Sequence, residues 1–131
     1  MQAERRRAVK GDMARHSVPA QPPEERIKNF REVALGFTPE LALAEAERCL
    51  NCKNAPCMKG CPVGVHIPEF ISHVRSGELD KAAKVLLSDN NLPAICGRVC
   101  PQENQCEKLC VRREKLGGSV AIGALERYVA D

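Results

Sequence analysis

The feature that most constrains this chain is a dense run of cysteines near its middle. Cys49, Cys52, Cys57 and Cys61 lie within thirteen residues, and Pro62 follows the last of them. A cuboidal iron–sulfur cluster needs four ligands that converge from several directions, and a tight loop supplies three of them at short spacing. Because the fourth ligand usually comes from elsewhere, a second group of cysteines is expected to complete the site.

That second group lies nearer the C-terminus. It consists of Cys96, Cys100, Cys106 and Cys110, with Pro101 directly after the second. Cys96 and Cys100 are four residues apart, as are Cys106 and Cys110, which is about one helical turn. Two groups of this kind can exchange ligands and build two clusters.

Three explanations of the eight cysteines compete. A disulfide framework needs an oxidising compartment, but Met1 is followed by charged residues rather than an apolar signal segment, so we expect a cytoplasmic protein. A zinc finger needs two CxxC pairs, and only Cys49 and Cys52 form one. The first run is close to the bacterial ferredoxin spacing, with two residues inserted. Iron–sulfur clusters are therefore favoured, and the alternative is a zinc-binding structural or interaction module without a redox role.

Charge and apolar content argue against two kinds of partner. The formal net charge of +3 comes entirely from residues 1–37, where a short basic run has no aromatic platform beside it, so no nucleic-acid partner is predicted. No stretch reaches the roughly 18 apolar residues of a membrane span, so no membrane partner is predicted either.

Several cations near the cysteines, Arg48 and Arg112 among them, would lower the pKa of the thiols. Taken one by one, we expect such residues to be ordinary surface charges.

Helical patterns dominate the remainder of the chain. We expect a mostly extended or flexible basic arm over residues 1–23 and an all-α domain over residues 24–131. Thr38 is the predicted N-cap of one helix, with Leu43, Ala46 and Leu50 on one face, and Ser119 that of the last. The expected helices cover residues 23–33, 38–48, 67–76, 78–88, 93–99 and 120–129, and residues 51–66 are expected to form a loop.

Five motifs then occur in the order seen in one known family. They are Cys49-x2-Cys52-x4-Cys57-x3-Cys61-Pro62, Ser88-Asp89-Asn90, Cys96-Gly97-Arg98-Val99-Cys100-Pro101, Cys106-Glu107-x2-Cys110 and Val120-Ala121-Ile122-Gly123-Ala124-Leu125-Glu126-Arg127. Over residues 24–131 the chain closely resembles the N-terminal cluster domain of glutamate synthase small subunits. The same domain type occurs in the large subunit of NADH-dependent ferredoxin:NADP oxidoreductase and in dihydropyrimidine dehydrogenase.

The resemblance implies an alpha-helical ferredoxin with two [4Fe–4S] clusters. Carried over by position, the ligands of one cluster are Cys49, Cys52, Cys57 and Cys110, and those of the other are Cys61, Cys100, Cys106 and Glu126. Dihydropyrimidine dehydrogenase has a glutamine at the position of Glu126. Cys96 is the alternative eighth ligand, and in the family pattern it is instead a buried thiol. A plainer interpretation makes Glu126 a surface residue paired with Arg127 or Lys115.

The resemblance also implies partners. Family members continue into domains that bind FAD and NAD(P)H, so we expect an adjoining or partner flavoprotein domain and a larger oxidoreductase subunit. This chain lacks the G-x-G-x-x-G fingerprint of such domains. No nucleophile–base arrangement is visible in it, because His16, His66 and His73 look isolated, so no catalytic residue is predicted. His66 lies beside the first cysteine run, and we expect it to be a surface loop residue rather than a partner of a ligand.

Overall fold

The computed structural model describes residues 14–114 and 117–131, and their regular structure is helical. The elements are α2 (Pro23–Arg26), α3 (Pro39–Glu47), α4 (Pro56–Gly60), α5 (Ile67–Arg75), α6 (Leu79–Asp89), α7 (Pro93–Val99), the 3-10 helices η1 (Gln102–Asn104) and η2 (Glu107–Leu109), and α8 (Ile122–Ala130). The β-type pairing in these residues is one isolated bridge between Ala20 and Ala34. The predicted all-α class is confirmed.

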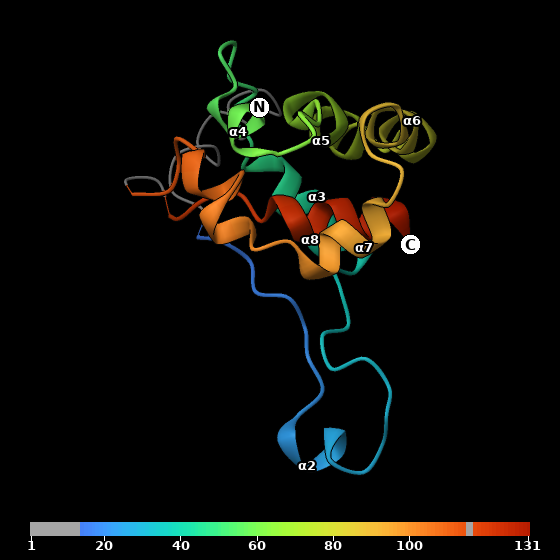
Figure 1. The fold of residues 1–131 in the computed structure, drawn as a ribbon. Helices are drawn as coiled ribbons and strands as arrows, with labels where there is room; N and C mark the ends of the chain where they lie inside the picture. The colour runs from blue at the N-terminus through green and yellow to red at the C-terminus, as the bar shows by residue number, and fades with distance from the viewer. Residues whose placement is uncertain (1–13, 115–116) are drawn as a thin grey trace, which may run out of the picture.

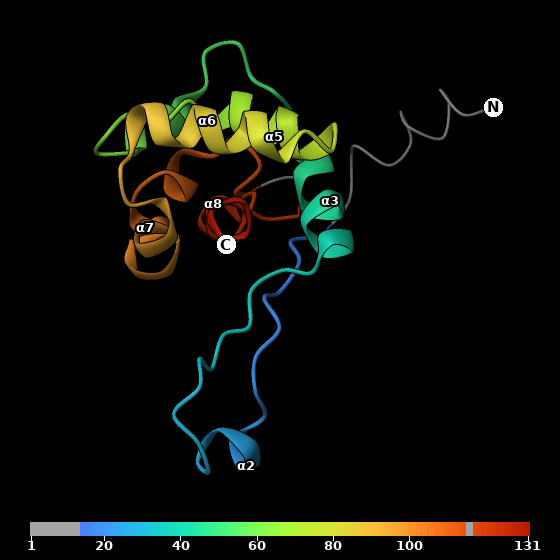
Figure 2. The ribbon, with the colours of Figure 1, turned by 90° about the vertical axis from the view of Figure 1, so that its right-hand side faces the viewer.

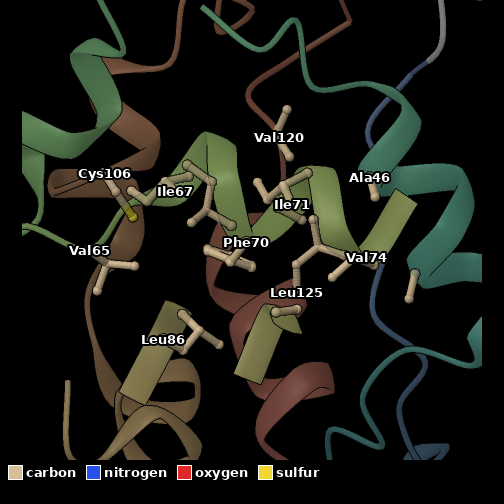
Figure 3. Packing of buried hydrophobic residues seen from close by; sticks show 14 of the residues in the cluster. Ala46, Val65, Ile67, Phe70, Ile71, Val74, Leu86, Cys106, Val120 and Leu125 are labelled. Carbon is tan, nitrogen blue, oxygen red and sulfur yellow. The ribbon is translucent and has the colours of Figure 1, made fainter. Parts of the chain in front are cut away.

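The helices surround α8. Figure 2 shows α8 end-on, with α5 and α6 above it and α7 and α3 on its two sides. Apolar side chains of α5, α6 and α8 meet between them, including Phe70, Ile71, Leu86 and Leu125, all of them buried (Figure 3). Burying such a side chain contributes roughly 1.5–3 kcal/mol, so this cluster helps to position α8, which also packs closely against α7.

Helix α3 starts as its sequence predicts. The Thr38 hydroxyl accepts a hydrogen bond from the Leu41 amide at 3.3 Å, and Pro39 occupies the first turn. The predicted buried face is wrong in part, because Leu43 and Leu50 are exposed. The helix instead buries Ala42, Glu45 and Ala46. A buried carboxylate is not expected from apolar periodicity, and its partners are described below.

The predicted helix over residues 23–33 is mostly wrong. Only Pro23–Arg26 is helical, and residues 20–36 project from the body as an arm with α2 at its tip (Figure 1). Side-chain hydrogen bonds compete with the helix here: the Gln21 amide donates to the Glu32 carbonyl at 2.7 Å, and the Asn29 amide to the Glu25 carbonyl at 2.9 Å. Phe30 has no core beside it and stays fully exposed, so burial does not support further helical turns.

Two further boundaries differ from the predictions. The stretch 51–66 contains the short helix α4, which Pro56 opens. Helix α8 begins at Ile122 rather than Val120, and Ser119 does not cap it. The Ser119 hydroxyl accepts from the Arg15 guanidinium at 2.9 Å instead. The other predicted helices are present, with ends within two residues of those expected.

The N-terminal segment is described from residue 14 onward. Residues 14–22 are non-helical, and Arg15 forms an ion pair with Glu107 on η2 at 2.7 Å. That residues 1–23 form a flexible arm stays a prediction, and the basic run before residue 14 lies outside the described residues. No helix within 14–114 or 117–131 is both long and apolar enough to cross a membrane.

Candidate metal centre

Four cysteines from two distant segments line one cavity. Cys49 follows α3, Cys52 lies in the next loop, Cys57 is in α4 and Cys110 directly follows η2. The cavity has a volume of about 30 Å³ and is partly open to solvent, and its remaining wall is largely apolar. Contributing apolar residues include Ile67, Ile71, Val120 and Ile122.

The packing of α4 against η2 brings these segments together. Gly60, the last residue of α4, makes the approach possible, because a Cβ there would lie 2.5 Å from the Gln105 carbonyl oxygen. Each short helix has cysteines at or next to both of its ends. Cys57 and Cys61 belong to α4 and its C-cap, and Cys106 and Cys110 flank η2. Cys57 and Cys110 therefore belong to the first group of cysteines, which lines this cavity. Cys61 and Cys106 belong to a second group.

Burial favours the neutral thiol at Cys49 and Cys57, two of the four cysteines that line the cavity. Burial, the largest cause, and charge repulsion from nearby Cys49, Cys110 and Cys52 together raise the pKa of Cys57 to about 12. Burial also raises the pKa of Cys49, with Cys110 and Cys52 acting in the same direction. Thiolates are the metal-binding form, so loading this cavity with metal must release protons.

A second group forms around Cys100 and Cys106. Burial is the largest of the effects that raise the pKa of Cys100 to about 11, and Cys96, Glu126 and Cys61 raise it as well. Burial is also the largest of the effects that raise the pKa of Cys106 to about 12, and the charges of Glu107, Cys61 and Glu126 act in the same direction. Cys61 and Glu126 therefore lie close to both thiols, and Cys96 lies beside Cys100. That either group supplies the ligands of a cluster stays a prediction.

Glu126 is partly buried on α8 and is not a surface ion-pair residue of Arg127. Burial raises its pKa to about 6, and the Asn90 amide opposes this by donating to Oε1 at 2.9 Å. Arg127 pairs instead with Glu32 at 2.9 Å and with Asp131 at 3.4 Å. The proposed pairing with Lys115 falls outside the described residues. Cys96 also reaches Asn90, whose Oδ1 lies 3.8 Å from its sulfur.

Two cations near the cysteines are buried rather than ordinary surface charges. Arg48 donates to Glu45 Oε1 at 2.5 Å and to the carbonyls of Gly117, Gly118 and Ser119. Glu45 also accepts from the backbone amides of His16 and Ala121. This buried network, which apolar periodicity did not reveal, fixes the end of α3 just before Cys49 and the segment that leads into α8.

Arg112 is buried as well, and it lines the cavity that holds Cys49, Cys52, Cys57 and Cys110.

The three histidines each contact a carboxylate and are not isolated. His66 is half exposed, and its Nδ1 lies 2.7 Å from Asp89 Oδ2. His16 contacts Glu45 and His73 contacts Glu78. In the described part of the chain, no group of three or more His, Cys, Asp or Glu side chains is placed to hold a single metal ion, so the histidines add no separate metal site there.

Asn90 is a site residue that was not predicted, although it lies in the Ser88-Asp89-Asn90 motif. It is buried and contacts Glu126 and Cys96. A polar residue in a helix-breaking stretch gives no sign of burial, so only the motif pointed toward it.

Comparison with known proteins decides the family. A family model described as dihydropyrimidine dehydrogenase domain II, 4Fe–4S cluster, matches residues 26–131. The chain belongs to this family. The thiol-rich donor set fits such a cluster, because sulfur ligands in an apolar setting are what iron–sulfur clusters use.

Named relatives of this dihydropyrimidine dehydrogenase domain II family member are oxidoreductase subunits. The glutamate synthase [NADPH] small chain of Halomonas elongata is 38% identical over 92% of this chain and 25% of its own length. The putative oxidoreductase AegA of Escherichia coli is 42% identical over 82% of this chain and 16% of its own. The NAD-dependent dihydropyrimidine dehydrogenase subunit PreT of Salmonella typhimurium is 38% identical over 76% and 24%. The chain thus spans a quarter or less of the length of these relatives.

Proposed function

We propose that the chain binds two [4Fe–4S] clusters and relays electrons to or from the FAD site of an NAD(P)H-dependent oxidoreductase. One observation carries the proposal. Cys49, Cys52 and Cys57 share an apolar cavity with Cys110, although that residue lies more than fifty positions further along the chain. A site built from a tight loop and one distant thiol is what a four-iron cluster requires.

The ligand sets follow from the two groups. Cys49, Cys52, Cys57 and Cys110 would hold the first cluster. Cys61, Cys100, Cys106 and Glu126 would hold the second, because Cys61 and Glu126 both lie near Cys100 and Cys106. Cys96 is the alternative eighth ligand.

Helices α4 and η2 would each carry ligands of both clusters, so the two clusters would lie close enough to exchange electrons. Cys57 and Cys61 are one turn apart, which is about 6 Å along a helix axis. Two clusters held from the ends of the same short helices would be neighbours in the protein. When bound, the clusters would supply one-electron redox chemistry, while the chain holds them close and shields them from water.

The partners are inferred from the relatives. Two of their names include NADPH or NAD, and each relative is at least about four times as long as the matched segment. We therefore place the nicotinamide and flavin chemistry in an adjoining or partner flavoprotein domain, within a larger oxidoreductase subunit in the cytoplasm. No substrate-converting residue is assigned to the chain itself.

Iron and acid-labile sulfide per chain, measured after anaerobic reconstitution, test this function, together with EPR of the reduced protein. We expect about eight of each and the signals of two interacting four-iron centres. About four of each would contradict the two-cluster assignment. A colourless protein with stoichiometric zinc and no iron would overturn the electron-transfer function in favour of a zinc-binding module.

A further inference from the structure

Asn90 is a buried polar side chain at the junction of three helices. It lies between α6 and α7 and is only 8% exposed. Its backbone amide donates to the Leu86 carbonyl at 2.8 Å, which ties it to the end of α6. Its side chain reaches Leu92, the N-cap of α7, and Glu126 in the middle of α8. Burying an amide is costly unless its polar atoms are satisfied, so these contacts determine how it is held.

The hydrogen bonds fix which way the amide points. The Leu92 backbone N–H can only donate, and it lies 2.9 Å from Asn90 Oδ1, so the oxygen must face α7. The Cys96 thiol donates to the same oxygen at 3.8 Å. The Asn90 NH2 group is thereby directed at α8, where it donates to Glu126 Oε1 at 2.9 Å.

The two side chains that Asn90 contacts are the two candidates for the eighth ligand. It donates to Glu126, and it accepts from Cys96. The bond to Glu126 holds one carboxylate oxygen in place, whereas the bond from Cys96 engages the thiol with the Asn90 oxygen. One amide in one orientation therefore holds the carboxylate and engages the thiol.

We propose that Asn90 is a positioning residue that holds Glu126 in the ligand set of the second cluster and keeps Cys96 out of it. The inference rests on the proposed function, since it concerns the cluster held by Cys61, Cys100 and Cys106. A donated hydrogen bond also withdraws negative charge from the carboxylate, and this stabilises the reduced cluster. Asn90 thus raises the reduction potential of the second cluster and leaves the first unaffected.

The test compares Asn90→Ala and Asn90→Asp with the matched control Asn91→Ala, all reconstituted anaerobically in the full chain. Asn91 is the same residue type, adjacent in sequence and exposed. Iron and sulfide content, EPR of the reduced clusters and a redox titration are recorded. Asn90→Asp keeps the oxygen that accepts from Leu92 but replaces the donor with a second carboxylate facing Glu126.

We expect Asn90→Ala to retain both clusters and to shift only the second to a more negative potential. We expect the ratio of reduced to oxidised cluster at a fixed potential to fall about tenfold, which corresponds to a shift of about 59 mV for one electron. In Asn90→Asp the EPR signal of the second cluster should change as well. The control should match the wild type.

The outcomes separate this inference from the proposed function. Fewer than two clusters in the wild type would overturn the proposed function, whatever the variants do. A wild type with two clusters, and both Asn90 variants with unchanged potential and EPR, would overturn the inference alone. Loss of both clusters from both variants would also overturn it, because Asn90 would then support the fold in general.

Discussion

Glu45 offers the sharpest test of how the buried polar network holds the domain together. Its carboxylate is fully buried and accepts from the Ala121 amide at 2.8 Å, from the His16 amide at 2.9 Å and from Arg48. Burial alone would raise the pKa of Glu45, but the hydrogen bonds and the charge of Arg48 bring it below its ordinary 4.5. The carboxylate is therefore ionised and paired at neutral pH.

The change Glu45→Ala leaves the Arg48 guanidinium buried without this carboxylate and removes an acceptor from the Ala121 amide. Breaking a buried ion pair from one side costs about 3–5 kcal/mol. For a chain of this size, 1 kcal/mol corresponds to roughly 3–5 °C in Tm, so a fall of about 9–25 °C is expected. Glu45→Gln keeps an acceptor oxygen and should fall between this variant and the wild type.

The assay is thermal unfolding of the cluster-loaded chain under anaerobic conditions, followed by far-UV circular dichroism and by visible absorption. Glu47→Ala is the matched control, because Glu47 lies on the same helix and is exposed. A Glu45→Ala protein that melts within about 3 °C of Glu47→Ala would refute the argument that this network is a major support of the fold.

Three further predictions concern the scaffold. Leu125→Ala should destabilise the domain by about 2–5 kcal/mol in chemical unfolding, because the side chain is fully buried, whereas Leu87→Ala on an exposed site should change little. Gly97→Ala should lower Tm and loosen the contact between α7 and α8, because its Cβ would lie 2.7 Å from an α8 backbone nitrogen; an unchanged Tm would contradict this close approach. A hydrogen bond with Asp89 raises the pKa of His66 above 6.5, and the same bond lowers that of Asp89 below 3.8. The contribution of the His66–Asp89 pair to stability is therefore complete between pH 3.8 and pH 6.5. It is lost as pH rises through the folded-state pKa of His66 or falls through that of Asp89, so His66→Gln should lower Tm near pH 5.5 and not near pH 9.

Local sequence was enough where the cause of a structure is local. Thr38 and Pro39 predict the start of α3, and Pro93 predicts that of α7, because caps and proline act within one turn. The apolar spacing of Phe70, Ile71 and Val74 predicts the buried face of α5. The residue type and density of the cysteines predicted sulfur-rich metal chemistry, and the family model agrees with it.

Other features depend on contacts between distant parts of the chain. The helix predicted after Pro23 fails beyond Arg26, because Ile27 and Phe30 find no core to pack against. Ser119 contacts Arg15 instead of capping α8, since a residue more than a hundred positions away offers it a partner. Neither outcome is encoded in the local pattern.

Eight thiols in two runs, with helices between them, can be read directly from the amino-acid sequence. Which thiols meet depends on the fold, because α4 and η2 pack together and direct the cysteines at their ends to two groups. The burial of Glu45 and Asn90 depends on the fold as well. A polar residue becomes buried only where distant backbone and side-chain groups satisfy its hydrogen bonds, and their positions are set by the whole fold.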